Sequence, residues 1–243
     1  MNQAPSNTAD FLLGLVPARA GSKRVPDKNI RSFGGPSLLS LAIRGAMDAE
    51  CIDEVALSTD SPEYVALAAA AGHHEPYRRP AAVSGDDVTS IETVVDYLAW
   101  RSKQGMAKPS HVVLLQPTSP FRTPAMIDSA IAAWRRSGKR SLVSATPAAP
   151  NSSYLVHRRH DDRDGALEIG NGLRDTYVLD GTLYITPYDM LFDENRFWDE
   201  HSEVFVIHYP RPFDIDSETD FHAAETLASA DLNYAEFETG DSA

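Results

Sequence analysis

Short apolar segments alternate along the chain with segments whose apolar residues recur at helical spacing. The apolar segments have the length of buried strands and are not interrupted by polar residues at every second position. The predicted strands are Phe11–Val16, Val55–Ser58, Val112–Gln116 and Ser141–Ala145. The predicted helices are Ser37–Met47, Glu63–Ala71, Val88–Lys103 and Pro124–Arg136. This alternation predicts an α/β fold, with a mostly parallel sheet covered by helices on both faces.

The alternation breaks down between about residue 146 and about residue 180. Prolines, a charged cluster at residues 157–164 and several glycines give this stretch a composition unsuited to a second core. We interpret it as an inserted arm that could form a dimerisation hairpin. Order returns with strands at 182–185 and 204–207 and a helix at 218–230. We therefore predict a tail at 1–10, one domain at 11–235 and a frayed tail at 236–243.

The chain is strongly acidic, with 22 Lys and Arg against 35 Asp and Glu and a formal net charge of -13. Such a field repels nucleic acid and anionic membranes, so neither is an expected partner. The single cysteine, Cys51, cannot form an intramolecular disulfide, which favours a reducing compartment. No apolar run is long enough to cross a membrane, and Met1–Asp10 lacks the order of a signal peptide. We therefore expect a cytoplasmic protein.

The segment after the first predicted strand concentrates positive charge. Residues 17–29 contain Arg19, Lys23, Arg24 and Lys28, together with a run of small residues. Small residues let the backbone approach an anion and offer its N–H groups, and guanidinium and ammonium groups supply the charge that phosphate binding requires. Taken alone, the segment is interpreted equally well as a solvated basic loop. The glycine spacings of a P-loop and of a dinucleotide-binding fingerprint do not occur.

The basic segment is the first of six sequence blocks that together resemble a known family. They are Leu15–Arg19 with Gly21–Lys23, Pro26 and Lys28–Asn29; Ser58–Asp60; Arg79–Ala81; Ser90–Ile91; Leu114–Thr123; and Asp214–Asp216. In content and order they resemble the CMP-sialic acid synthetases (acylneuraminate cytidylyltransferases), whose relatives act on legionaminic, pseudaminic and KDO-type sugars. The resemblance covers about residues 11 to 230.

The resemblance implies a Rossmann-like nucleotidyltransferase fold, CTP as donor, an acidic sugar as acceptor, Mg²⁺ as cofactor and a homodimer. Carried across by position, it implies phosphate contacts for Arg19, Ser22 and Lys28. It implies cytidine contacts for Asn29, Arg79 and Ser90, and an acceptor contact for Gln116.

Asp214 and Asp216 are candidate metal ligands. They flank Ile215, so in an extended segment both carboxylates point to the same side. Two hard oxygen ligands could hold Mg²⁺, with water and phosphate oxygens completing an octahedron. Asp-x-Asp is common on acidic surfaces, where it has no metal-binding role. The position of this pair after the strand at 204–207 and its match to the family block favour a metal-binding role here.

The implied reaction is attack of the sugar's anomeric hydroxyl on the α-phosphorus of CTP, with pyrophosphate leaving in line. Fixed cations and a metal can stabilise the developing charge by several kcal/mol. We expect Arg19, Lys28 and Asp216 to be the catalytic residues. The sequence does not decide which group deprotonates the hydroxyl.

The sequence departs from the family pattern on the acceptor side. Asp180 stands where members that use sialic acid carry asparagine, and Gly170–Arg174 replaces an element that would supply a sugar-binding arginine. An added carboxylate in a site for an anionic sugar is costly unless it is paired. Sialic acid, a legionaminic- or pseudaminic-type sugar and KDO therefore all remain open as acceptors.

Two other functions compete with this one. One is a nucleotidyltransferase for another nucleotide and sugar, against which the Arg79–Pro80 and Leu115–Arg122 blocks argue. The other is a catalytically silent nucleotide-binding relative, against which the intact Arg19, Lys28 and aspartate pair argue.

Overall fold

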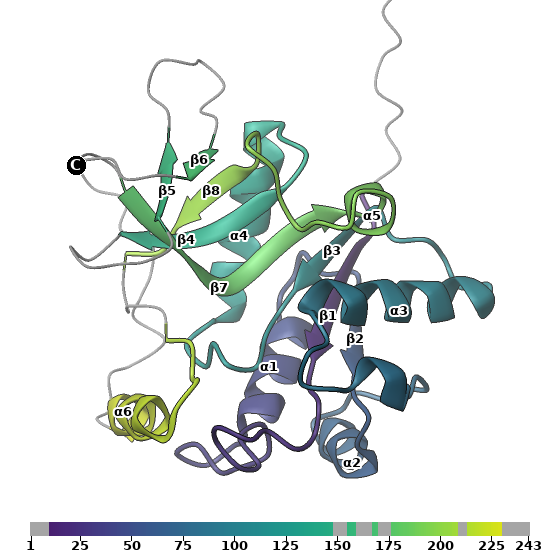
Figure 1. Ribbon diagram of the computed structural model, residues 1–243, viewed down its shortest axis with the longest axis vertical. Helices are drawn as coiled ribbons and strands as arrows, with labels where there is room; N and C mark the ends of the chain where they lie inside the picture. The colour runs from purple at the N-terminus through teal and green to yellow at the C-terminus, as the bar shows by residue number, and fades with distance from the viewer. Residues whose placement is uncertain (1–9, 148–154, 159–166, 170–175, 209–212, 230–243) are drawn as a thin grey trace, which may run out of the picture.

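The computed structural model describes residues 10–147, 155–158, 167–169, 176–208 and 213–229 (Figure 1). Six strands form the main path of one sheet in the order β2-β1-β3-β7-β4-β8. In chain order they are β1 (Leu12–Pro17), β2 (Glu54–Ser58), β3 (His111–Leu114), β4 (Leu142–Pro147), β7 (Thr176–Pro187) and β8 (Glu203–Val206). β1 pairs in parallel with β2 and β3, and β4 with β8, whereas β7 runs antiparallel to both of its neighbours. The sheet is therefore mixed but mostly parallel, as predicted.

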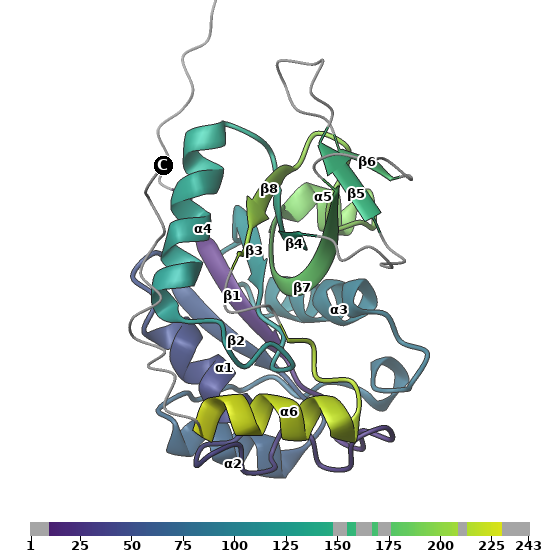
Figure 2. The ribbon, with the colours of Figure 1, turned by 90° about the vertical axis from the view of Figure 1, so that its left-hand side faces the viewer.

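Helices cover both faces of the sheet (Figures 1 and 2). One face carries α1 (Leu38–Met47), α2 (Pro62–Ala70) and α4 (Pro124–Ser137). The other carries α3 (Ser90–Lys103) and α5 (Tyr188–Phe192), and a short 3-10 helix at Ala81–Val83 precedes α3.

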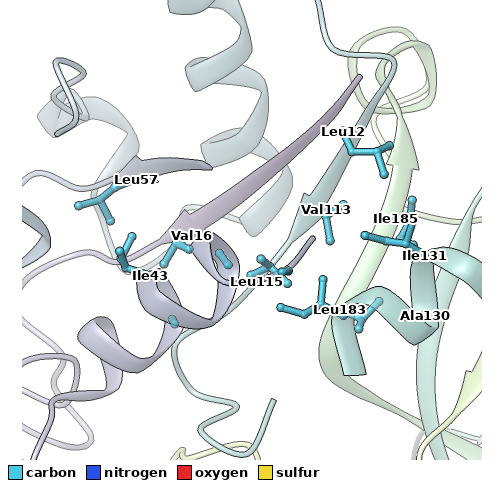
Figure 3. Close-up of a cluster of buried hydrophobic side chains, with 14 of the residues drawn as sticks. Leu12, Val16, Ile43, Leu57, Val113, Leu115, Ala130, Ile131, Leu183 and Ile185 are labelled. Carbon is cyan, nitrogen blue, oxygen red and sulfur yellow. The ribbon is translucent and has the colours of Figure 1, made fainter. Parts of the chain in front are cut away.

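Alternate residues of each central strand pack into opposite cores. Leu12 and Val16 of β1 join the cluster with α1 and α4 (Figure 3). Leu13 and Leu15 join the cluster with α3. Because both faces are buried, a strand here needs no polar alternation. This explains the uninterrupted apolar segments in the sequence.

Part of the predicted arm belongs to the main sheet. β7 begins at Thr176, before the predicted strand at 182–185, and pairs with β4 as far as Pro147. Two further strands, β5 (Leu155–Arg158) and β6 (Leu167–Ile169), pair with each other, and β5 pairs with β7. The family-element segment Gly170–Arg174 lies outside the described residues, as do the tails at 1–9 and 236–243.

A register irregularity between β4 and β7 shapes the edge of the sheet where β3 ends. Val143 pairs with Tyr184, but Ala145 pairs with Leu179, so the residues between Leu179 and Tyr184 bulge out of the ladder. Gly181 in this bulge has φ 71°, a left-handed conformation that favours glycine. The bulge places Asp180 and Gly181 beside the loop that leaves β3.

The last described helix, α6 (Glu218–Ser229), packs against the loop that follows β1. Phe221 of α6 and Ile215 are fully buried with Phe33 and Val25 of that loop. The helix begins with a reciprocal cap in which Ser217 and Asp220 each accept a hydrogen bond from the other's backbone N–H. Asp220 therefore caps the helix. Among the described residues, no helix is long and apolar enough to cross a membrane.

Candidate active site

The loops after β1, β2 and β3 meet at one edge of the sheet, because these strands are parallel. The N–H of Ala18 donates to Ser58 O at 2.9 Å, and the N–H of Ala20 donates to Asp60 Oδ1 at 2.9 Å. Ligands of open α/β sheets bind at this edge. The loops after β1 and β2 are therefore in direct contact at the edge where a ligand would bind.

The basic loop carries its exposed cations on a backbone that turns sharply at Gly21. That glycine has φ 70°, and a Cβ placed there would meet only open space. Arg19 is partly buried and Lys23 is exposed, and both form ion pairs with the carboxylate of Asp86. The distance from Arg19 Nη2 to Asp86 Oδ1 is 2.7 Å. Ser22 lies between them in the sequence and is partly buried. The loop therefore already gathers two cations around one anionic group.

Lys28 lies deeper and connects the basic loop to the aspartate pair. Its side chain is 11% exposed, and Nζ donates to Ile215 O at 2.5 Å and lies 3.7 Å from Asp216 Oδ1. Burial lowers the pKa of Lys28, and the carboxylates of Asp216 and Asp214 oppose that effect. Lys28 is therefore a cation held in place between the basic loop and the candidate metal ligands.

Asn29 and Arg19 are joined next to this lysine. Asn29 Nδ2 donates to Arg19 O at 3.3 Å, and the Asn29 side chain is buried. Through this bond and Lys28, the basic loop and the aspartate pair form one continuous group of residues. Electrostatic recognition of a triphosphate beside a divalent cation requires them to lie on the same face, and they do.

Asp214 and Asp216 project from a segment that is fixed at its centre. Ile215 is fully buried, and its N–H donates to Thr118 O at 3.0 Å, which ties the segment to the loop after β3. Arg24 donates to both oxygens of Asp216, at 3.0 and 2.9 Å. Asp214 keeps exposed surface, but partial desolvation raises the pKa of its carboxyl group. The negative charge of Asp216 raises this pKa further, whereas a hydrogen bond from Thr118 and the charge of Lys28 lower it.

Arg79 and Ser90 lie on the β2 side of the same edge. Arg79 is 6% exposed; Nε donates to Ser58 Oγ at 3.1 Å, and Nη2 donates to Ser58 O. The guanidinium therefore fixes the carboxyl end of β2, and burial lowers its pKa. Ser90 is exposed at the first position of α3, directly after the N-cap Thr89. Cytidine contacts by these two residues remain predictions.

Gln116 lies on the opposite, β7 side. Its Nε2 donates to Gly181 O at 3.4 Å, so the side chain contacts the β7 bulge. Arg122 Nη1 donates to Gln116 O at 3.0 Å and to Thr182 O at 2.7 Å. Arg122 is buried, and desolvation lowers its pKa to about 9. This arginine cross-links the loop after β3 to β7 and fixes the backbone that carries Gln116.

Sequence reasoning assigned no role to three residues that the structure brings to the site: Asp60, Asp86 and Arg122. Asp60 and Arg122 lie inside blocks that carried the family resemblance, so their position was a usable signal. Asp86 lies in an acidic loop before α3 and gave no such signal, because its partners Arg19 and Lys23 are distant in sequence.

Replacing Asp86 with asparagine should strengthen binding of CTP or pyrophosphate by about three- to tenfold, because the carboxylate competes with the ligand for Arg19 and Lys23 and exposed ion pairs are weak. Titration calorimetry measures the dissociation constants. The neighbouring substitution Asp87→Asn changes net charge equally and serves as the control. Weaker binding in the Asp86 variant would mean that the carboxylate preorganises the cations instead.

The fold and this site define a nucleotidyltransferase-like α/β protein with a basic loop beside two carboxylates. A family model described as cytidylyltransferase matches residues 13–163. The chain belongs to the cytidylyltransferase family.

Individual proteins support the same assignment. The chain is 32% identical to a CMP-N,N'-diacetyllegionaminic acid synthase of Legionella pneumophila over 226 residues, covering 89% of this chain and 95% of that protein. It is 27% identical to a pseudaminic acid cytidylyltransferase of Campylobacter jejuni, over 88% of this chain and 95% of the relative. Among solved structures, a CMP:2-keto-3-deoxy-manno-octonic acid synthetase complexed with CTP superposes with a TM-score of 0.72 at 14% identity, covering 92% of this chain and all of that one. The superposition on that solved structure establishes the fold.

Proposed function

We propose that this protein transfers CMP from CTP to the anomeric hydroxyl of an acidic 3-deoxy-ulosonate sugar and releases pyrophosphate. The observation that carries the proposal is the placement of Lys28 between the basic loop and the Asp214–Asp216 pair. The names of the similar proteins support a nine-carbon, sialic-acid-like acceptor such as a legionaminic or pseudaminic acid.

The reaction forms a bond between the anomeric oxygen and the α-phosphorus and breaks the bond from that phosphorus to the bridging oxygen of pyrophosphate. The hydroxyl proton passes to a base or to solvent. Arg19, Ser22 and Lys28 would hold the triphosphate, and Asn29, Arg79 and Ser90 would surround the cytidine. Gln116 would contact the sugar. Fixed cations reduce the repulsion between an anionic acceptor and an anionic nucleotide.

The residues fit a Mg²⁺ ion held by Asp214 and Asp216. Mg²⁺ is usually bound by one or two carboxylates plus substrate phosphates and water. Asp214 and Asp216 would supply two carboxylates, and phosphate oxygens and water would supply the remaining ligands. When bound, the ion supplies positive charge to the phosphate oxygens. We further propose a cytoplasmic homodimer in which the arm between β4 and β7 contributes the contact; light scattering tests the dimer.

The test of the proposed function is pyrophosphate release with Mg²⁺ across four nucleotides and a panel of acidic sugars. We expect release with CTP and a sialic-acid-like sugar, and at least tenfold less with UTP, ATP or GTP. A preference for UTP would instead support a different nucleotidyltransferase. Absence of release with every nucleotide and acidic sugar would support a catalytically silent relative.

A further inference from the structure

Arg24 contacts the carboxylate of Asp216 with both ends of its guanidinium group. Nη1 donates to Oδ2 at 3.0 Å, and Nη2 lies 2.9 Å from Oδ1. Two parallel bonds of this kind are among the stronger contacts that arginine makes with a carboxylate. Asp216 is also a candidate ligand for Mg²⁺, and the ion would have to approach one of the same two oxygens. Arg24 and a metal ion therefore compete for Asp216.

Asp216 is already shared by two cations. Nζ of Lys28 lies 3.7 Å from Oδ1, the oxygen that Arg24 Nη2 contacts. The carboxylate carries a single negative charge, so Arg24 and Lys28 together more than neutralise it. A divalent ion brought to the same carboxylate would be repelled by both cations at short range. Binding of the metal at Asp216 is therefore favoured when one of the two cations moves away.

Arg24 is the cation that can move. Lys28 is largely buried, and its Nζ donates to Ile215 O at 2.5 Å. The side chain of Arg24 is 72% exposed. The next residue, Val25, is fully buried in the cluster that contains Ile215, so the backbone beside Arg24 is anchored while the side chain extends into solvent. The guanidinium can therefore change its partner without unpacking any part of the core.

The proposed triphosphate site offers Arg24 a second partner. Arg24 belongs to the same loop as Arg19 and Lys23, which both form ion pairs with the carboxylate of Asp86. Phosphate oxygens held by this loop would carry more negative charge than the carboxylate of Asp216. A guanidinium group also matches phosphate in the same two-point geometry as it matches a carboxylate. A bound nucleotide would therefore draw Arg24 away from Asp216.

We propose that Arg24 is a positioning residue that couples nucleotide binding to metal binding. Its guanidinium occupies Asp216 until the phosphates of the nucleotide take it over, and this exchange frees the carboxylate for Mg²⁺. The inference rests on the proposed function, because it takes Asp216 as a metal ligand and the basic loop as the phosphate site. Removal of the guanidinium should therefore have two opposite effects: tighter binding of a divalent cation and weaker binding of phosphate groups.

Arg24→Gln tests both effects without measuring turnover. We expect the dissociation constant for Mn²⁺, used in place of Mg²⁺ and followed by electron paramagnetic resonance without nucleotide, to fall by about three- to tenfold. The dissociation constant for pyrophosphate, measured by calorimetry in the presence of a metal chelator, should rise by a similar factor. These changes are modest because exposed ion pairs are weak. A residue that only maintained the fold would weaken both interactions.

Two variants separate competition for Asp216 from a general change in charge. Lys23→Gln removes one positive charge from the same loop but from a residue that pairs with Asp86, so the Mn²⁺ dissociation constant should change by less than about twofold. Arg24→Lys keeps the charge but cannot make the two-point contact, so its Mn²⁺ affinity should lie between those of the wild type and Arg24→Gln. Thermal melting checks that each variant is folded.

Asp216→Asn distinguishes failure of this inference from failure of the proposed metal site. Weaker Mn²⁺ binding in Asp216→Asn, without tighter binding in Arg24→Gln, would overturn the coupling role of Arg24 and leave the metal site in place. An equal gain of Mn²⁺ affinity in Lys23→Gln and Arg24→Gln would also overturn it. Mn²⁺ binding by Asp216→Asn as tight as that of the wild type would overturn the metal role of Asp216 itself, and the inference with it.

Discussion

Asp216→Asn should lower kcat/KM for pyrophosphate release by about a thousandfold or more while CTP still binds weakly. The substitution removes a proposed carboxylate ligand for Mg²⁺ and the charge that pairs with Arg24 and Lys28. A metal and its ligands stabilise the charge of a phosphoryl-transfer transition state by several kcal/mol, and each 1.4 kcal/mol is a factor of ten. Turnover measured against Mg²⁺ concentration, with CTP binding followed by calorimetry, separates catalysis from binding.

The matched control for Asp216 is Glu218→Gln. Glu218 lies two residues further on and pairs with Arg31 at 2.7 Å, also on the surface. Losing this ion pair should change activity by less than about threefold, since exposed pairs contribute little. Full activity in Asp216→Asn would remove the proposed metal role of this residue, and a Mg²⁺ requirement that is unchanged in a weakened enzyme would point to a structural role.

Lys28→Met should weaken CTP binding by about a hundredfold and lower kcat/KM at least as much. Methionine preserves much of the side-chain volume but removes the charge next to Asp216 and leaves Ile215 O without its donor. Loss of a charged hydrogen-bond partner at a largely buried position costs about 1.5–3 kcal/mol. Dissociation constants for CTP and CDP, measured by calorimetry, show whether the lost interaction is with the phosphates.

Lys23→Met is the comparison for Lys28, because Lys23 belongs to the same loop but its side chain is 80% exposed. We expect it to weaken CTP binding only a few-fold, since an exposed charge is screened by water and salt. Equal effects of the two substitutions would contradict the distinction between a buried cation and an exposed surface cation. Thermal melting of both variants checks that neither effect comes from unfolding.

The α/β architecture was predictable because its signals are local. Runs such as the one in β1 are apolar throughout since both of their faces are buried, and helix starts such as that of α4 carry a capping Thr123 followed by Pro124. The bounds of β7 were not predictable to the same degree. Its first half, before Asp180, forms a strand because it pairs with β4 and β5, which are distant in sequence.

The candidate site was predictable only as a set of loops. Arg19, Lys28 and the aspartate pair could be selected from their residue types and from family blocks, and the structure places Lys28 against Asp216. The pairing of Arg19 with Asp86 and the anchoring of Gln116 through Arg122 could not be predicted. These contacts join segments that are far apart along the chain, and no sequence pattern links them.

The sequence by itself determined the fold class, the basic loop, the Asp-x-Asp pair and, by resemblance, the kind of reaction. These properties depend on the order of residue types along a short stretch of chain. Only the tertiary structure decided which oxygen of Asp180 lacks a donor, that Asp86 pairs with two cations of the basic loop and that the lysine at position 28 is buried beside the candidate metal ligands. Each of these depends on the distance and orientation between side chains from separate elements, which packing of the whole domain sets.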